Sequence, residues 1–467
     1  MWGRGAPVSG HLPRGFSRRA FRLACLAAVG TNRGALTRID RALVGPSRAE
    51  ARRAERHRRT AIDAATTLGE MKGGAMKVAQ FASYIDLSFI PAAYRPFYEV
   101  ELARLRDGAQ PLPWPLVRRV LEQEWNRAPE SMFEHFCEDA AAAASIGQVH
   151  RAVLPGGRVV AVKVQYPGIR AAVAADLDAA AVLLRLVRRF APGVDPHDIA
   201  TELRARILQE LDYRLEARQQ AVFAQAYRGH PFIYVPDVVA ELSTERVLVS
   251  DWVEGEGFDA LRACDESERN RVGEIVFRFY LRSLHVCGAY NADPHPGNFI
   301  ARADGSVAFV DFGAVTVPPA DWLGPRLAIM RASTAGDPEA LHRALARAGY
   351  LDADDDLPAL LRGVVRQDGW MLEDRQLVLD VELLRQSLPL VTNLGSEINY
   401  LLRHGRVPGT ELWLRRLHYS LLLVLGQLGV TANWGRIARE WLLDDEPETP
   451  LGEAEQRFFA RADRAAA

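Results

Sequence analysis

The sequence is poor in lysine and cysteine and contains no long hydrophobic run. Only three of its 58 basic residues are lysines, Lys72, Lys77 and Lys163, and the rest are arginines. The four cysteines lie far apart and form no C-x-x-C pair, which argues against a metal site or disulfide framework and favours a reducing compartment. No apolar stretch reaches the ~18–20 residues that cross a bilayer. The best candidate, residues 419–430, is predicted to be a buried helix.

Charge is balanced over the whole chain but not over its first residues. The net charge is -1, and basic and aromatic residues do not alternate as in a nucleic-acid binder, so we expect no nucleic-acid partner. Residues 1–60 contain 14 arginines and three acidic residues. This segment is either a peripheral contact with anionic lipid or a solvated, disordered arm. We therefore expect a cytoplasmic protein, or one peripheral to the inner face of the membrane.

Apolar periodicity separates helical from strand-like segments. Helices are predicted over residues 60–84, 116–125, 171–190 and 199–227. Strands are predicted over residues 148–154, 158–165, 234–242 and 246–253, and the first two are joined by a Pro-Gly-Gly hairpin turn. Beyond residue 259 the pattern is mainly helical, apart from a polar segment over residues 290–315.

The polar segment carries most of the chemistry. Residues 291–298 read N-A-D-P-H-P-G-N, and a β-like run then leads to D-F-G at residues 311–313. An Asp, an Asn five positions later and an Asp-Phe-Gly follow the order of groups in protein kinases. Mg²⁺ prefers oxygen ligands, so Asn298 and Asp311 are predicted to bind it. Asp293 is predicted to accept a proton from an attacking hydroxyl or to orient a water.

A lysine upstream supplies the matching cation. Residues 160–163 read V-A-V-K, and strand alternation places Lys163 on one face, where its ammonium can meet the phosphates of ATP. A kinase lysine needs a glutamate partner on a helix. Asp212 and Glu216 form an i,i+4 pair on the predicted helix 199–227, and a nearby cation would relieve their repulsion. We predict that Glu216 is the partner of Lys163.

Together these segments resemble the AarF/UbiB family of atypical protein-kinase-like proteins, from about residue 68 to residue 317. Six elements of the family have counterparts in this sequence. They are K-x-G-Q at residues 77–80, the Ala-rich loop at 140–148, V-A-V-K-V-Q-Y-P-G at 160–168, E-x-D at 210–212, A-D-P-H-P-G-N at 292–298 and V-D-F-G at 310–313. Ala79 stands where the family usually has Gly. Asn291 stands where it usually has His, at a position that we interpret as outside the phosphate chemistry.

The resemblance implies ATP and Mg²⁺ as cofactors and assigns further residues. The nucleotide site is expected to include Ala143, Ala144 and Ser145 of the Ala-rich loop, with Val253 as a further nucleotide contact. The helix that carries Lys77 and Gln80 is expected to pack over the cleft and exclude protein substrates. Regulatory contacts are expected between Lys77 and two acidic residues, Glu210 and Asp212.

The resulting prediction is an α+β, bilobal, protein-kinase-like fold with an N-terminal helical extension over the active site. We expect a basic arm at residues 1–59, the extension at 60–135, a β-rich N-lobe at 136–254 and a helical C-lobe at 255–467. The resemblance implies an ATPase or unorthodox kinase that supports isoprenoid quinone or lipid metabolism. Its partners are then ATP, ADP and a lipid or quinone-precursor ligand.

Two alternatives remain open. The first is a nucleotide-binding pseudokinase scaffold, which would gain thermal stability from Mg-ATP without releasing phosphate. The second is a conventional Ser/Thr kinase, which would carry an A-P-E-like end to its activation segment after Asp311. The sequence has only Val-Pro-Pro at residues 317–319 there.

Overall fold

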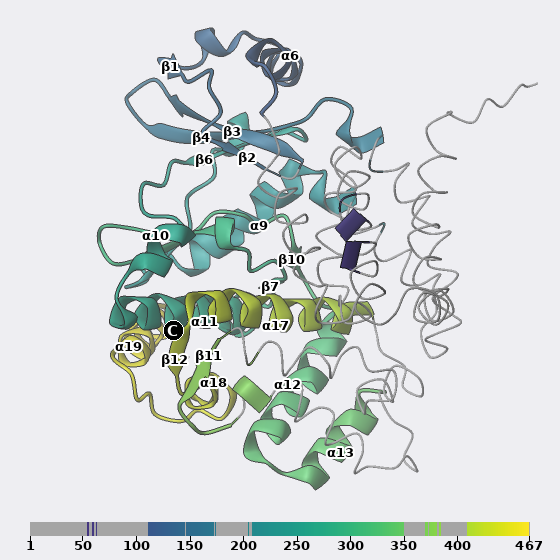
Figure 1. The fold of residues 1–467 in the computed structure, drawn as a ribbon, viewed down its shortest axis with the longest axis vertical. Helices are drawn as coiled ribbons and strands as arrows, with labels where there is room; N and C mark the ends of the chain where they lie inside the picture. The colour runs from purple at the N-terminus through teal and green to yellow at the C-terminus, as the bar shows by residue number, and fades with distance from the viewer. Residues whose placement is uncertain are drawn as a thin grey trace, which may run out of the picture.

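The computed structural model describes residues 111–144, 146–171, 208–349, 373–380 and 409–466, together with a few isolated positions outside these ranges. A small sheet lies above a larger helical body, and the two form the predicted α+β bilobal, kinase-like architecture (Figure 1). Most of the predicted basic arm, of the predicted extension and of the predicted helix 171–190 lies outside the described residues.

The small lobe is an antiparallel sheet with helices on both faces. Its elements are α6 (Trp114–Trp125), a 3-10 turn (Pro129–Ser131), β1 (His135–Phe136), β2 (Ala142–Ala143), β3 (Gly147–Val153), β4 (Val159–Gln165), α9 (Tyr213–Ala226) and β6 (Val247–Asp251). The strands pair in the order β1-β3-β4-β6, and β2 pairs with β3. The predicted hairpin between β3 and β4 is confirmed, and its turn glycines, Gly156 and Gly157, have positive φ angles.

Strand alternation gives the two faces of β4 different neighbours. Val160, Val162 and Val164 are buried against α6, which forms one core of this lobe with them. The residues between them therefore point to the opposite face, toward α9. Lys163 belongs to that second set, so the pattern V-A-V-K-V places an ammonium group where the sheet faces the helical lobe.

The large lobe is built around α11 (Glu266–Cys287), which Asp265 caps through a hydrogen bond from the Glu268 N–H. The other elements of this lobe are β5 (Ile233–Tyr234), α10 (Phe258–Ala263), β7 (Tyr290–Asn291), β8 (Phe299–Ala301), β9 (Val307–Phe309), β10 (Val315–Thr316), α12 (Ala320–Ala335), α13 (Pro338–Arg347), β11 (Leu377–Leu379), α17 (Gly409–Leu428), β12 (Val430–Ala432), α18 (Trp434–Leu442) and α19 (Pro450–Ala466). Short 3-10 turns lie at Ala240–Leu242, Pro296–Asn298 and Gly369–Met371.

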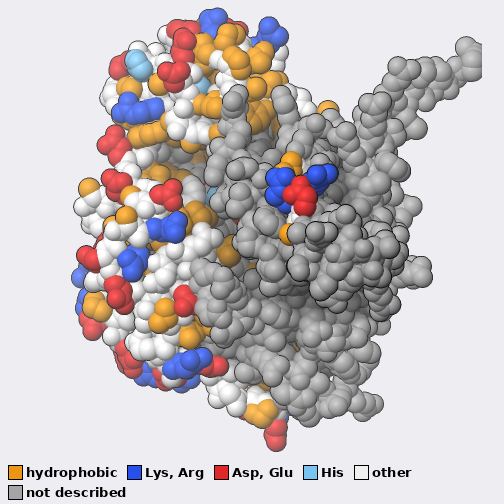
Figure 2. Space-filling view, viewed as in Figure 1, with side chains coloured by type: hydrophobic (Ala, Val, Ile, Leu, Met, Phe, Trp, Pro, Cys, Tyr) orange, Lys and Arg blue, Asp and Glu red, His pale blue; other side chains and the backbone are white. Residues whose placement is uncertain are grey.

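The apolar run near the end of the chain is a buried helix, as predicted. It forms the second half of α17, whose Leu421 and Leu425 are fully buried beside α11. Within the part of the chain that the structure describes, no helix is both long and apolar enough to span a membrane. Figure 2 shows basic and acidic side chains interspersed over the described part of one face.

Two sequence predictions of secondary structure are wrong. The predicted helix 199–227 is interrupted, because Asp212 has an extended backbone and caps α9, which begins at Tyr213. Asp212 and Glu216 therefore do not form an i,i+4 pair on one helix. The predicted strand 234–242 is reduced to β5 and a 3-10 turn at Ala240–Leu242. Pro236 lies between them and has no N–H to donate to a sheet.

Candidate active site

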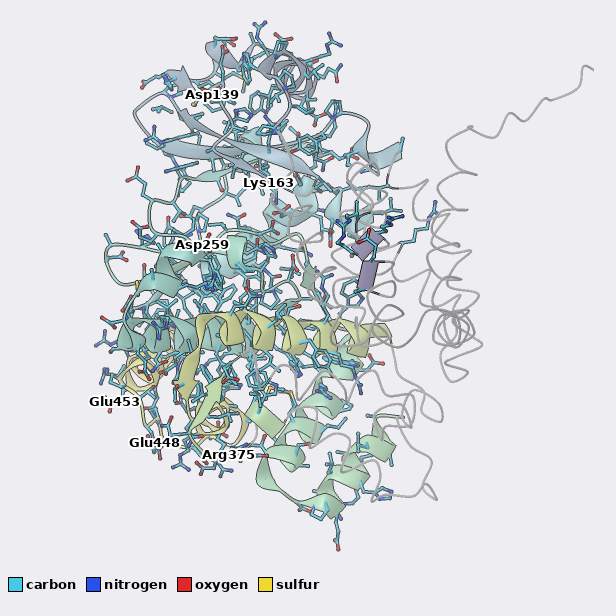
Figure 3. The ribbon with its side chains drawn as sticks, viewed as in Figure 1. Asp139, Lys163, Asp259, Arg375, Glu448 and Glu453 are labelled. Atoms are coloured by element: carbon cyan, nitrogen blue, oxygen red, sulfur yellow. The ribbon has the colours of Figure 1, made fainter. Side chains whose placement is uncertain are left out.

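Lys163 lies between the small sheet and the helical lobe (Figure 3), where it forms ion pairs with two carboxylates. Its Nζ atom is 2.7 Å from Oε1 of Glu216 on α9 and 3.0 Å from Oδ2 of Asp311. The ammonium also lies 5.1 Å from the centre of the Tyr213 ring. The predicted pairing of Lys163 with Glu216 is therefore present, and α9 supplies the carboxylate although the helix is shorter than predicted.

Electrostatics keep this lysine charged. Burial alone would lower the pKa of Lys163, but the carboxylates of Asp311 and Glu216 outweigh it and hold the pKa well above its ordinary value. The ammonium is therefore a permanent cation at neutral pH. Such a group can contact phosphate oxygens without first acquiring a proton.

Asp311 joins the lysine to the segment that follows β9. Its Oδ1 atom accepts a hydrogen bond from the Gly313 N–H at 3.0 Å, while Oδ2 accepts from Lys163. The neighbouring Phe312 is fully buried and packs against Phe223 of α9. About a third of the Asp311 side chain, 32%, remains exposed. The segment is thus anchored by its aromatic residue, while its carboxylate keeps access to solvent.

Asn291 connects this segment to the loop that carries Asp293. Its amide nitrogen donates to the Asp311 carbonyl at 2.7 Å, and its amide oxygen accepts from the Asp293 N–H at 3.1 Å. β7 and β10 pair at the same point, with Asn291 opposite Val315. The Asn291 side chain thus fixes the main chains of two predicted active-site residues relative to each other, and our interpretation of Asn291 as outside the phosphate chemistry stays a prediction.

The loop itself presents oxygen atoms suited to a hard cation. The amide nitrogen of Asn298 donates to the Asp293 carbonyl at 3.0 Å, so its amide oxygen is directed elsewhere. Together with the carboxylate of Asp311, this gives the kind of donor that Mg²⁺ prefers. The two residues predicted to bind the metal thus fit it chemically, and the remaining ligands would come from phosphates and water.

Asp293 has a partner that the sequence did not reveal. Nη2 of Arg416, on α17, lies 2.7 Å from Oδ1 of Asp293. The side chains are 7% and 14% exposed, respectively. An unbroken series of contacts therefore runs from Lys163 through Asp311, Asn291 and Asp293 to Arg416.

The Ala-rich loop is a tight reversal over the sheet. β2 pairs with β3, with Ala143 opposite Gln148, and the Ala144 N–H donates to the Gly147 carbonyl at 2.8 Å. A side chain at Gly147 would place its Cβ 2.3 Å from the Val164 carbonyl, so only glycine permits this close approach. Ser145 lies outside the described residues. Residues 141–143 are exposed and Ala144 is partly buried, and the predicted contact of this loop with phosphates stays a prediction.

The other predicted residues are placed less centrally. Gln148, the last residue of the Ala-rich segment, is buried and binds the backbone of Leu112. Val253 follows the end of β6, and its predicted contact with nucleotide stays a prediction. Glu210 is buried and lines a small cavity with Gly313 and Trp413.

The regulatory contacts predicted from the resemblance also remain predictions. Asp212 accepts a hydrogen bond from the Arg214 N–H as the cap of α9. Lys77 and Gln80 lie outside the described residues, so their expected contacts with Glu210 and Asp212 are not tested by the structure.

Comparisons with known proteins point in the same direction as this geometry. Residues 104–331 match the family model described as the ABC1 atypical kinase-like domain. The chain is 30% identical over 272 residues to an atypical kinase, the mitochondrial COQ8B of Danio rerio, in a match that covers 58% of this chain and 43% of that protein. It is 35% identical over 239 residues to the chloroplastic Protein ACTIVITY OF BC1 COMPLEX KINASE 3 of Arabidopsis thaliana. That match covers 50% of this chain and 34% of the Arabidopsis protein. Each match spans less than half of the curated relative.

A solved structure is similar over a larger share of the chain. The Mycobacterium tuberculosis protein Rv3197, determined in complex with erythromycin, is 30% identical and superposes with a TM-score of 0.59. The match covers 84% of this chain and 98% of the solved one. The likeness therefore extends beyond the segment matched by the family model.

Proposed function

The chain belongs to the ABC1 family of atypical kinase-like proteins, the AarF/UbiB family, and from this premise we propose that it is a Mg-ATP-dependent ATPase or unorthodox kinase. The observation that carries the proposal is the position of Lys163, within 3.0 Å of both Glu216 and Asp311. Phosphoryl transfer in kinases needs a lysine held by a glutamate and an Asp beside the metal, and the contacts of Lys163 support the proposal.

Each residue has a distinct part in the proposed reaction. The ammonium of Lys163 contacts phosphate oxygens, and Glu216 keeps it in place. Asn298 and Asp311 hold Mg²⁺, which when bound neutralises negative charge on the phosphates. The backbone of Ala143, Ala144 and Ser145 covers the phosphates, and Val253 contacts the nucleotide. Asp293 orients the hydroxyl or water that accepts the phosphoryl group.

In the proposed transfer, one bond to the γ-phosphorus forms as another breaks. The acceptor oxygen forms a bond to the γ-phosphorus, and the bond from that phosphorus to the ADP oxygen breaks. The electron pair of the broken bond leaves with ADP. Asp293 receives the proton that the acceptor oxygen loses.

We further propose a lipid or quinone precursor as the acceptor or effector, with the protein cytoplasmic and peripheral to a membrane. The basic segment over residues 1–60 supports membrane contact, because each basic residue near an anionic surface adds about 1 kcal/mol. The Lys77 and Gln80 helix would cover the cleft and exclude protein substrates. The small ligand in the complex of the solved relative makes erythromycin a useful comparison ligand for this chain.

The decisive test is phosphate release by the purified full chain with Mg-ATP, with and without anionic liposomes and phenolic quinone precursors. We expect Asp311→Asn to lower the rate at least ~100-fold, because it removes a charged ligand from the proposed site. Asp304→Asn is the matched control, since Asp304 lies on an exposed turn and binds Ser306. It should change the rate less than twofold.

Each possible result separates the candidate functions. A wild-type protein that gains thermal stability from Mg-ATP but releases no phosphate is a nucleotide-binding scaffold. Unchanged phosphate release by Asp311→Asn would refute the metal role. Stimulation of phosphate release by phenols or liposomes, with no stimulation by erythromycin, supports a lipid or quinone effector. Formation of more ADP than free phosphate supports a lipid or quinone acceptor, because the transferred phosphoryl group stays on the acceptor.

A further inference from the structure

A helix from the last sixth of the chain reaches the predicted catalytic loop. Arg416 of α17 and Asp293 are 123 residues apart in the sequence, and their side chains form an ion pair of 2.7 Å. Arg416 lies between the buried residues Leu414 and Leu417, so the packing of α17 against the core fixes where its side chain begins.

The guanidinium of Arg416 is itself held in place. It lies 5.5 Å from the centre of the Trp413 ring, one turn earlier on the same helix. A guanidinium beside an aromatic ring gains a favourable cation–π contact and loses rotational freedom. A contact within α17 therefore helps to set the direction in which Arg416 approaches Asp293.

The backbone around Asp293 is fixed without help from Arg416. The Asp293 N–H donates to the Asn291 side chain, and the Asp293 carbonyl accepts from Asn298 at 3.0 Å and from the Tyr280 hydroxyl at 3.5 Å. Three side chains thus hold the main chain of this residue. Arg416 contacts the carboxylate of Asp293 and not its main chain. Loss of this contact should therefore change the position of the carboxylate more than the backbone of the loop.

We propose that Arg416 is a positioning residue for Asp293. It holds Oδ1 of the carboxylate, which fixes the orientation in which Asp293 meets the acceptor hydroxyl or water. This inference rests on the proposed function, because it describes how the acceptor is oriented in that reaction. It assigns a role in phosphoryl transfer to α17, which lies outside the matched family segment of residues 104–331.

The test compares Arg416→Met, Arg416→Lys and wild type in Mg-ATP-dependent phosphate release by the full chain. Arg416→Met should lower kcat about 10- to 100-fold while the KM for ATP changes less than threefold, because the nucleotide contacts stay intact. Arg416→Lys should recover part of the loss, since it restores a cation but not the planar fork. Arg439→Met, which removes a different C-lobe ion pair with Asp445, is the control and should leave kcat within twofold.

A second readout does not depend on activity. The decreases in Tm of Arg416→Met and Asp293→Asn should not add in the double variant, because both single changes break the same contact. Additive decreases would show that the two side chains are not coupled and would overturn the proposal.

The outcomes also distinguish this inference from the proposed function. If wild type releases phosphate and Arg416→Met retains full kcat, the positioning role is wrong while the proposed function stands. If the KM for ATP rises as much as kcat falls, Arg416 acts on nucleotide binding and the proposal is again wrong. If wild type releases no phosphate, both proposals fail together.

Discussion

Two groups of buried charges connect the elements of this protein, and they differ in how completely they are enclosed. The site cluster consists of Lys163, Glu216 and Asp311 and joins β4 and α9 to the segment after β9. The C-lobe cluster is centred on Arg278 of α11 and includes Glu274, Glu440 and Glu455, so that it ties α18 and α19 to the central helix. The side chain of Arg278 is 0% exposed, whereas Asp311 in the site cluster keeps a third of its surface exposed.

The C-lobe cluster uses every donor of its cation. Nε of Arg278 donates to Glu274, Nη1 to Glu440 and Glu455, and Nη2 to Glu440 and Thr449. The close approach also requires Gly452 on α19, where a Cβ would lie 2.7 Å from Nη2 of Arg278. A planar group with five donors, fully paired, is suited to fixing elements together.

The site cluster uses a different kind of cation. A lysine ammonium is a compact point charge that can exchange one oxygen partner for another, and its partner Asp311 faces solvent. The contrast teaches that the C-lobe cluster is closed and structural, while the site cluster remains open to a ligand. Three predictions, each with a control variant, can break or sharpen this comparison.

The largest effect is expected from Arg278→Met, which leaves buried carboxylates without their cation. Loss of one partner from a buried ion group costs about 3–5 kcal/mol, so the free energy of unfolding in urea should fall by that amount at pH 7. Burial already raises the pKa of Glu440 above its ordinary value of 4.5. A carboxyl group with a raised pKa in the folded state takes up a proton more readily there than in the unfolded state, so proton binding stabilises the folded variant. The stability difference between Arg278→Met and wild type should therefore shrink as the pH falls toward 4.5.

Arg282→Met is the matched control for that variant. Arg282 also contacts Glu455, but its side chain is partly exposed, and Arg278 would still pair the carboxylate. It should therefore destabilise the protein less. Equal losses from the two variants would show that the C-lobe cluster does not depend on the enclosed cation.

The next effect is expected from Lys163→Arg, which keeps the charge but changes its shape. The Lys163 ammonium fits between two carboxylates at 2.7 and 3.0 Å. A planar guanidinium is larger than the ammonium and spreads its charge over three nitrogens. Phosphate release should fall about 10- to 100-fold, equivalent to roughly 1.4–2.7 kcal/mol. The unfolding midpoint should fall less than in Arg278→Met, because Glu216 and Asp311 still have a cation between them.

The reciprocal exchange, Arg278→Lys, completes this test. It should lower stability without lowering phosphate release, since the C-lobe cluster lies outside the proposed site. If Lys163→Arg is as active as wild type, the chain's use of lysine at this position has no chemical basis, and the contrast between the two clusters fails.

Much of the site could be predicted from the sequence because its signals are local. The hairpin turn needs positive φ angles that Gly156 and Gly157 supply, and the alternation of β4 sets the direction of Lys163. The pairing of Lys163 with Glu216 is present in the structure, although the i,i+4 pair of Asp212 and Glu216 from which it was argued is not. The error over residues 234–242 came from apolar composition, which outweighed Pro236 in the prediction.

The contacts that could not be predicted join residues far apart in the sequence. Arg416 is one of 55 arginines, and no local pattern marks it as the residue that α17 directs toward Asp293. Arg278 and Glu455 are likewise 177 residues apart. Tertiary packing decides which face of a helix meets which loop, so these pairs become visible only in the folded chain.

The smallest effect is expected from Tyr213→Phe, which compares the buried hydroxyl of Tyr213 with the hydrogen-bonded hydroxyl of Tyr227. Its ring lies beside Lys163, its hydroxyl is buried with no hydrogen-bond partner among the described residues, and burial raises its pKa well above the ordinary value. Tyr213→Phe keeps the ring and removes an unsatisfied hydroxyl, so the free energy of unfolding should rise by about 1 kcal/mol. Tyr227→Phe is the matched control, because the Tyr227 hydroxyl bonds Ser283 at 3.1 Å, and it should lower stability by about 1 kcal/mol. Changes of the same sign in the two variants would contradict this distinction, because they would mean that the two hydroxyls have equivalent surroundings.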